Sequence, residues 1–163
     1  MFTIRAGYSD DFEVKASIEK VRGFFADIRN FINLMPNVES IQKIGENAAR
    51  WSIRADIPLI GSMQQFFNVA LAENSDDRVE WIPRKAERQN LLRYSAEFME
   101  KTAEVTLVRF AQNVELRRDK ARDLHLLAGL AGETRISQGM QWEVAGMIKN
   151  FVRKAKAQLE NAK

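Results

Sequence analysis

The fold is decided by residues 133–159, which read ETRISQGMQWEVAGMIKNFVRKAKAQL. Apolar residues recur there in steps of three and four, the period of an amphipathic helix, over about six turns. A helix buries such a stripe against another apolar surface. We therefore expect one long C-terminal helix, roughly Glu133 to Leu159. Its buried stripe should consist of Ile136, Met140, Val144, Met147, Ile148, Phe151, Val152, Ala155 and Leu159.

The surface for this helix comes from upstream segments in which apolar and polar residues alternate, the period of a β-strand. Turn signals such as Asn74-Ser75-Asp76-Asp77 join neighbouring segments tightly, and strands joined in this way pair antiparallel. The sequence thus predicts an α+β domain in which a curved antiparallel sheet of about six or seven strands wraps the C-terminal helix. The expected strands cover residues 12–18, 38–44, 49–57, 63–73, 79–82, 92–98 and 105–117.

Two short helices are expected after the first strand. Ser17 is a candidate N-cap for a helix over residues 19–28, in which Val21, Phe24 and Phe25 recur at helical spacing. A second turn of helix over residues 29–34 must end before Pro36, whose ring disfavours helix at the preceding residue.

Length and composition suit a single globular domain. The chain has 163 residues, of which 45% are apolar and 29% charged. We expect one domain over residues 1–163, with its core over about residues 10–162. The absence of cysteine excludes disulfides, a thiol nucleophile and zinc–thiolate sites. It is compatible with the cytoplasm, where we expect the protein to reside.

Charge and hydropathy argue against two classes of protein. The net charge is +3, but Lys and Arg alternate with Asp and Glu along most of the chain, so we expect no nucleic-acid interface. The N-terminus lacks the features of a signal peptide, and the longest nearly apolar stretch, residues 124–132, is far shorter than the ~20 residues of a spanning helix. We expect a protein that is not integral to a membrane, with peripheral contact left open.

The order and content of these segments resemble the START-like superfamily, also called the polyketide cyclase/dehydrase and lipid transport superfamily or SRPBCC. The resemblance rests on Phe24-Phe25-Ala26-Asp27, on the corner at residues 31–38, on the start of the last strand at Thr106-Leu107-Val108, and on the last helix. The corner at residues 34–39 and the loop Pro58-Leu59-Ile60-Gly61 are most similar to the branch named after the G subunit of carbon monoxide dehydrogenase. This chain has Pro36-Asn37 where that branch usually has Pro-Gly.

The resemblance implies a helix-grip fold with a cavity between the sheet and the last helix. Such cavities hold lipids, sterols, quinones, polyketides or other apolar molecules. We expect a cavity bordered by aromatic residues of the strands and closed by the helix stripe. The candidate ligand-binding residues are Trp51, Ile53, Met63, Phe67, Val69, Trp81, Tyr94, Phe98, Val108, Phe110, Gln112, Met140, Val144, Met147 and Phe151.

Gln112 stands out because it interrupts the apolar phase of the last strand. A buried amide needs hydrogen-bond partners. A ligand oxygen or a neighbouring core group could supply them, or a bulge in the strand could turn the side chain outward. Tyr94 raises the same question with its hydroxyl. His125, the sole histidine, is interpreted as structural or surface-lying, since no set of carboxylates converges on it. No metal-binding spacing or nucleophile motif is found, so we expect no catalytic residue, metal or cofactor.

The leading hypothesis is a non-enzymatic binder or carrier of an apolar small molecule. A cyclase- or dehydratase-type enzyme is the second, and a membrane-surface module that delivers a bound ligand is the third. For ligand access we expect residues 57–61 and 124–132, which combine leucine or isoleucine with glycine, to flank the cavity mouth.

Overall fold

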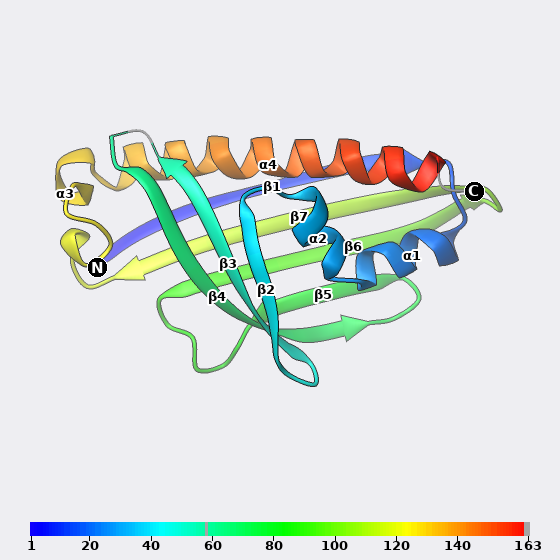
Figure 1. Cartoon of the computed structure of the whole chain (residues 1–163), viewed down its shortest axis with the longest axis horizontal. Helices are drawn as coiled ribbons and strands as arrows, with labels where there is room; N and C mark the ends of the chain where they lie inside the picture. Colours follow the sequence, from blue (N-terminus) through cyan, green and yellow to red (C-terminus); the bar gives the residue numbers. More distant parts are fainter. Residues whose placement is uncertain (58, 162–163) are drawn as a thin grey trace.

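The computed structural model describes residues 1–57 and 59–161. Most of the chain lies in a single curved sheet and one long helix (Figure 1). The strands are β1 (Phe2–Val14), β2 (Val38–Gly45), β3 (Ala48–Ile57), β4 (Gly61–Asn74), β5 (Arg78–Pro83), β6 (Asn90–Thr102) and β7 (Val105–Arg118). The helices are α1 (Ile18–Ala26), α2 (Arg29–Leu34), the 3-10 turn η1 (Ala121–Asp123), α3 (Ala128–Ala131) and α4 (Glu133–Asn161).

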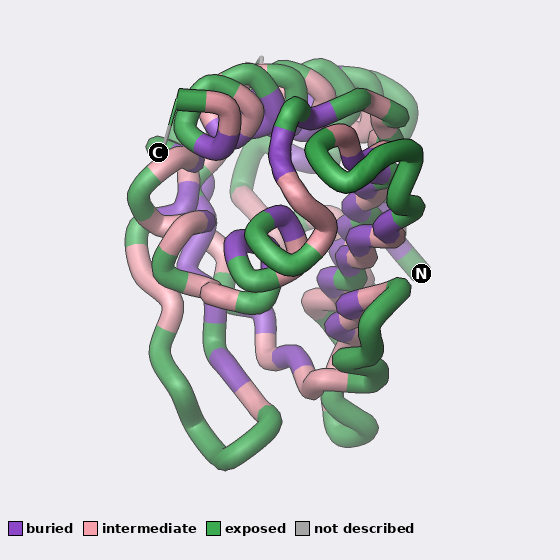
Figure 2. The backbone as a smooth tube through the Cα atoms, turned by 90° about the vertical axis from the view of Figure 1, so that its right-hand side faces the viewer, coloured by how far each residue is buried: buried purple, intermediate pink, exposed green. Residues whose placement is uncertain are grey.

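The seven strands form one antiparallel sheet in the order β1-β7-β6-β5-β4-β3-β2. Consecutive strands from β2 to β7 are neighbours, as the turn signals predict, whereas β1 joins the far edge beside β7. Buried and exposed positions alternate along the strands (Figure 2), so one face of the sheet points to the core. The predicted α+β architecture, with the sheet wrapped on the C-terminal helix, is confirmed.

The first strand differs from its prediction. The sequence pattern predicts it over residues 12–18, but β1 runs from Phe2 to Val14, and Ile18 begins α1 instead. Its buried residues Phe2, Ile4 and Ala6 lie before the expected start. Apolar and polar residues alternate along the whole strand, but Asp10 interrupts the apolar row between Tyr8 and Phe12. A polar side chain is tolerated there because the strand lies at a sheet edge.

The short helices follow the sequence closely. Ser17 is extended and its side chain accepts a hydrogen bond from the backbone N–H of Lys20 at 3.4 Å, so the predicted N-cap is confirmed. The second helix spans residues 29–34 as expected, and Phe31 is its one buried residue. The turns η1 and α3 have no counterpart among the expected elements.

Helix α4 covers the free edge of β1. Glu133 Oε1 accepts from the N–H of Thr3 at 3.0 Å, and Ser137 Oγ accepts from the N–H of Arg5 at 3.3 Å. One helical turn further on, the Gln141 amide accepts from the N–H of Gly7 at 2.8 Å and donates to its carbonyl at 2.6 Å. The polar side of the helix thus satisfies backbone groups that an edge strand would otherwise leave to water.

The other side of α4 faces the core. All nine stripe residues expected from the sequence are buried, from Ile136 at the start to Leu159 near the end. Over the residues described, no helix combines the length and the hydrophobicity that crossing a bilayer requires.

The buried stripe can be tested at Met147, which is 9% exposed. Met147→Asp would bury an unpaired carboxylate, so we expect it to lower the free energy of unfolding by several kcal/mol. Urea unfolding followed by circular dichroism measures this loss. Gln138→Asp, on the exposed side of the same helix, is the control and should change stability by less than about 0.5 kcal/mol. Equal midpoints for the two variants would show that the stripe does not face the core.

The contact between α4 and β1 can be tested at Gln141. Gln141→Ala removes both hydrogen bonds to Gly7, so we expect a loss of about 1 kcal/mol and faster amide exchange at Gly7. Hydrogen exchange read by NMR measures the second effect residue by residue. Gln138→Ala should leave the Gly7 amide unchanged. Unaltered protection of Gly7 in Gln141→Ala would argue that the side chain does not hold the strand.

Candidate ligand site

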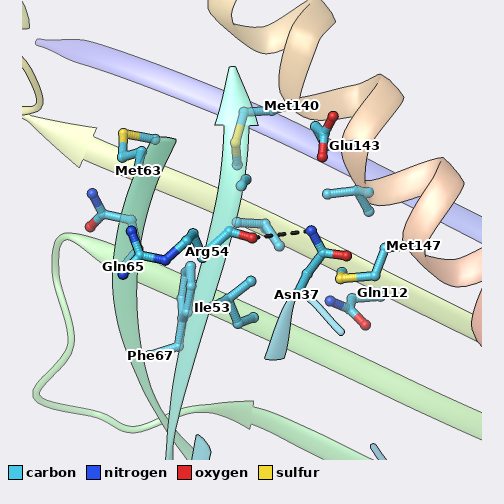
Figure 3. Close-up of a pocket in the computed structure, with 13 residues that line it drawn as sticks. Asn37, Ile53, Arg54, Met63, Gln65, Phe67, Gln112, Met140, Glu143 and Met147 are labelled. Atoms are coloured by element: carbon cyan, nitrogen blue, oxygen red, sulfur yellow. Dashed lines mark hydrogen bonds between the residues drawn. The ribbon is translucent and has the colours of Figure 1, made fainter. Parts of the chain in front are cut away.

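A small cavity lies between the sheet and α4 (Figure 3). Strands β3 and β4 form one wall, β7 forms the floor, and α4 closes the top. Its free volume is about 30 Å³, enough for about two water molecules. The lining residues are Asn37, Ile53, Arg54, Ala55, Met63, Gln65, Phe67, Gln112, Val114, Met140, Glu143, Val144 and Met147.

Gln112 is the polar residue of the cavity floor. It is 1% exposed, and neither its amide nitrogen nor its amide oxygen has a hydrogen-bond partner among the described residues. Of the three alternatives that the sequence leaves open, a bulge that turns Gln112 outward is excluded by this burial. Thr106, another buried polar residue of β7, behaves differently, since its hydroxyl donates to the carbonyl of Ala16 at 2.9 Å.

Beyond the cavity the interior is filled by aromatic rings. Phe31 of α2 lies at the centre of this group, with its ring centroid 5.0 Å from that of Phe151, 5.1 Å from Tyr94 and 5.5 Å from Trp51. Phe110 completes the surroundings at 6.2 Å. We call these five residues the aromatic cluster. Its rings occupy the space in which the sequence predicts a larger cavity.

Two members of the aromatic cluster carry unpaired polar groups. The Trp51 indole nitrogen and the Tyr94 hydroxyl are buried, and the structure gives neither a partner within the described part of the chain. Burial raises the pKa of Tyr94 well above its ordinary value of 10.0, because the phenolate would have to form out of contact with water. With Gln112, three interior side chains therefore retain unused hydrogen-bonding capacity.

The rim of the cavity is polar. Asn37 donates from its amide to the carbonyl of Arg54 at 3.2 Å, which ties the corner after α2 to β3 (Figure 3). Arg54 forms an ion pair with Glu39 at 3.3 Å. Glu143 approaches the rim from α4.

A hydrogen-bond network lies beside the cavity, at the end where β4 approaches β6 and β7. The Gln65 side-chain oxygen accepts from Asn90 Nδ2 at 3.0 Å and from the Arg118 guanidinium at 3.1 Å. Burial lowers the pKa of Arg118, although a guanidinium stays protonated in proteins. This network joins β4, β6 and β7 at one end of the site.

The candidate ligand residues fall into two groups. Seven line the cavity: Ile53, Met63, Phe67, Gln112, Met140, Val144 and Met147. Eight lie in the packed core and do not line it: Trp51, Val69, Trp81, Tyr94, Phe98, Val108, Phe110 and Phe151. Among the six aromatic residues expected to border a cavity, Phe67 alone does so. Asn37, Gln65 and Glu143 line the cavity without being expected from the sequence, because single polar residues from a corner, a strand and a helix leave no periodic signal.

Other predicted features lie elsewhere. His125 Nδ1 accepts from the N–H of Leu127 at 3.1 Å, a structural role as expected. The two segments expected to give ligand access contribute no residue to the cavity lining, although Leu59, Leu126 and Leu130 are highly exposed; Pro58 lies outside the described residues. Within residues 1–57 and 59–161, no three His, Asp or Glu side chains gather closely enough to hold a metal ion.

The environment of Tyr94 predicts a pH dependence. Its pKa is raised in the folded protein, so unfolding releases a phenol that ionises near pH 10. The stabilising contribution is complete below pH 10 and is lost as pH rises toward the folded pKa. We expect the free energy of unfolding to fall more steeply above pH 10 in the parent than in Tyr94→Phe. Urea titrations between pH 8 and 11 measure the free energy of unfolding, and absorbance at 295 nm follows the phenolate. Parallel pH profiles for the parent and Tyr94→Phe would contradict the burial of this hydroxyl.

Comparison of the sequence with known protein families gives one match. Residues 11–81, somewhat under half of the chain, match the family model of the carbon monoxide dehydrogenase G subunit (CoxG). No curated protein matches the sequence significantly.

Several solved structures share the whole fold. A START superfamily protein from Mycobacterium smegmatis superposes with a TM-score of 0.64 at 13% identity, over 96% of this chain and 99% of that one. The Zhui aromatase/cyclase from Streptomyces sp. R1128 gives 0.66 at 13% identity, over 97% and 98%. Norcoclaurine synthase from Thalictrum flavum, solved with dopamine and hydroxybenzaldehyde, gives 0.56 at 9% identity, over 99% and 90%. The chain therefore has the START-like helix-grip fold, and residues 11–81 match the CoxG family model.

Proposed function

We propose that the protein binds and carries an apolar small molecule, of the lipid, quinone, sterol or polyketide-like kind, between its sheet and α4. The observation that supports this most strongly is the unpaired amide of Gln112 on the floor of an apolar cavity. A buried amide without partners costs about 1–3 kcal/mol of stability. A leucine would fill the same position without that cost. Such a loss of stability is expected at a position whose side chain hydrogen-bonds to a ligand.

The rest of the lining suits an apolar ligand of variable shape. Met63, Met140 and Met147 approach the cavity from β4 and α4. Methionine is unbranched and polarisable, so it adapts to ligands of different outline. Pockets of this kind, apolar with a few polar groups that fix orientation, are typical of small-molecule sites.

The enzymatic alternative would need ionisable groups at the ligand. Arg54 and Glu143 are the charged residues of the lining, and both lie at its rim. Arg54 is already paired with Glu39. An aromatase/cyclase is among the proteins that share the fold. The neutral floor nevertheless favours binding over proton transfer. Glu143→Gln removes the rim carboxylate, and a carrier should retain its ligand in this variant.

The proposal is tested by Gln112→Leu. Because the variant removes an unpaired buried amide, we expect it to be more stable than the parent by about 1–3 kcal/mol. We also expect it to retain less ligand. Urea unfolding measures the first effect, and mass spectrometry of organic extracts from natively purified protein measures the second.

Thr106→Val is the matched control on the same face of β7. It removes a hydroxyl that is hydrogen-bonded to Ala16, so it should lower stability by about 1 kcal/mol and leave the extracted ligand unchanged. Extracts free of any apolar compound in both the parent and the control would overturn the binding function. A Gln112→Leu variant that is less stable than the parent would show that the amide has a structural partner.

A further inference from the structure

The cavity is too small for the ligand that the proposed function requires. About 30 Å³ is free, whereas a site for a drug-sized molecule measures several hundred cubic ångströms. If the protein binds such a molecule, an interior side chain must give way. The structure indicates which one.

Phe31 packs against two residues that have unused hydrogen-bonding capacity, Trp51 and Tyr94, whose rings also contact each other at 5.5 Å. Its ring centroid is 5.1 Å from that of Tyr94 and 5.5 Å from that of Trp51, and both of these residues have buried, unpaired polar atoms. A phenyl ring can neither accept nor donate a conventional hydrogen bond to them. The Phe31 ring therefore occupies a place where a more polar occupant would be better accommodated.

That place is continuous with the cavity. Tyr94 is the cross-strand partner of Gln112, which forms the cavity floor. Trp51 is the cross-strand partner of Phe67, which forms part of its wall. Directly opposed residues have Cβ atoms about 4.5–5.5 Å apart. Withdrawal of the Phe31 ring would join its space to the existing cavity.

Helix α2 is built so that Phe31 could be withdrawn. The helix has six residues, no side-chain cap at its start, and Phe31 as its one buried residue. On its outer side lies a groove of about 670 Å³, bordered by Ile28, Ile32, Ile41 and Trp81. The hydrogen bonds that hold the segment are made by Asn30, whose amide donates to the carbonyl of Phe24, by Asn37, whose amide donates to that of Arg54, and by the backbone of Phe31 itself. None of them involves the Phe31 ring, so the ring can leave its place by a change of side-chain rotamer or with the short helix as a unit.

We propose that Phe31 fills the inner half of the ligand site, and that a neutral ligand with an aromatic or similarly flat ring bearing an acceptor oxygen displaces it. The ring takes the place of the phenyl group, against the rings of Trp51 and Tyr94. The acceptor oxygen receives hydrogen bonds from the Trp51 indole N–H and the Tyr94 hydroxyl. A charged group is disfavoured there, because no counter-charge lies within the aromatic cluster over the described residues. This assignment rests on the proposed binding function.

The test uses Phe31→Ala and two probes of the same shape, acetophenone and α-methylstyrene. Acetophenone carries a carbonyl oxygen where α-methylstyrene carries a methylene group. Since the variant no longer has to displace a ring, we expect it to bind acetophenone at least about tenfold more tightly than the parent does. It should also prefer acetophenone over α-methylstyrene, and Tyr94→Phe in the Phe31→Ala background should reduce that preference about 2- to 10-fold.

Calorimetry gives the affinities, and the NMR signal of the Trp51 indole proton reports its hydrogen bond. Phe24→Ala is the control and should gain no affinity, because the ring of this buried phenylalanine on α1 packs against Phe25 and Phe151. Phe31→Leu serves if the alanine variant does not fold. Tight binding that perturbs Met63 and Gln112 but leaves the Trp51 indole unmoved overturns this inference alone. Absence of binding to parent and variant alike overturns the proposed function as well.

Discussion

Side chains of helix α4 hydrogen-bond to the backbone of strand β1 at regular intervals, because the spacing of every fourth helix residue nearly equals that of every second strand residue. Residues four apart on a helix rise about 6.0 Å, and residues two apart on a strand rise about 6.7 Å. Glu133, Ser137 and Gln141 therefore meet the backbone of Thr3, Arg5 and Gly7 in step. Because this contact fixes the rotation of α4 about its axis, the apolar stripe must face the sheet. Met140, Val144 and Met147 are placed over the cavity for the same reason.

Buried polar groups in this protein are of two kinds. Thr106 and Ser52 are hydrogen-bonded, the latter to Gln64 at 2.9 Å, and they contribute to the fold in the ordinary way. Gln112, Tyr94 and Trp51 are not. These three lie between α2, the sheet and α4, whereas Asn90, whose Oδ1 is also unpaired, uses its amide nitrogen to bind Gln65 and the carbonyl of Phe66. Stability has been given up in one part of the core, while the remainder follows the rule that buried polar groups are paired.

The fold could be predicted from the sequence because its strongest signals are long. The stripe of α4 extends over the whole helix, and most strands alternate cleanly. The first half of β1 escapes prediction although Phe2, Ile4, Ala6 and Tyr8 alternate with polar residues, because Asp10 interrupts their row and separates it from Phe12 and Val14. Gln112 could be singled out because it interrupts an otherwise apolar row.

The site could be predicted only in part. Residues that line a cavity and residues that fill one are both buried and apolar, so the periodicity of Trp51, Tyr94 or Phe110 is the same in either case. Which of the two occurs depends on rings supplied by other elements: Phe31 of α2 fills the space beside Trp51 and Tyr94, and Phe25 of α1 fills the space beside Phe98 and Phe110. The polar rim residues Asn37 and Glu143 come from different elements and meet only in the folded chain.

The coverage of β1 by α4 also determines how the protein can meet other copies of itself. Of the strands described, β1 and β2 lie at the sheet edges, and α4 side chains bind the outer backbone of β1 at Thr3, Arg5 and Gly7. The pairing of β2 with β3 shifts register near each end, between Val38 and Ser40 and between Lys43 and Gly45. An irregular edge with exposed charges is a poor template for strand addition. Strand addition from another copy is therefore blocked by helix side chains over the first half of β1 and disfavoured by irregular pairing along β2.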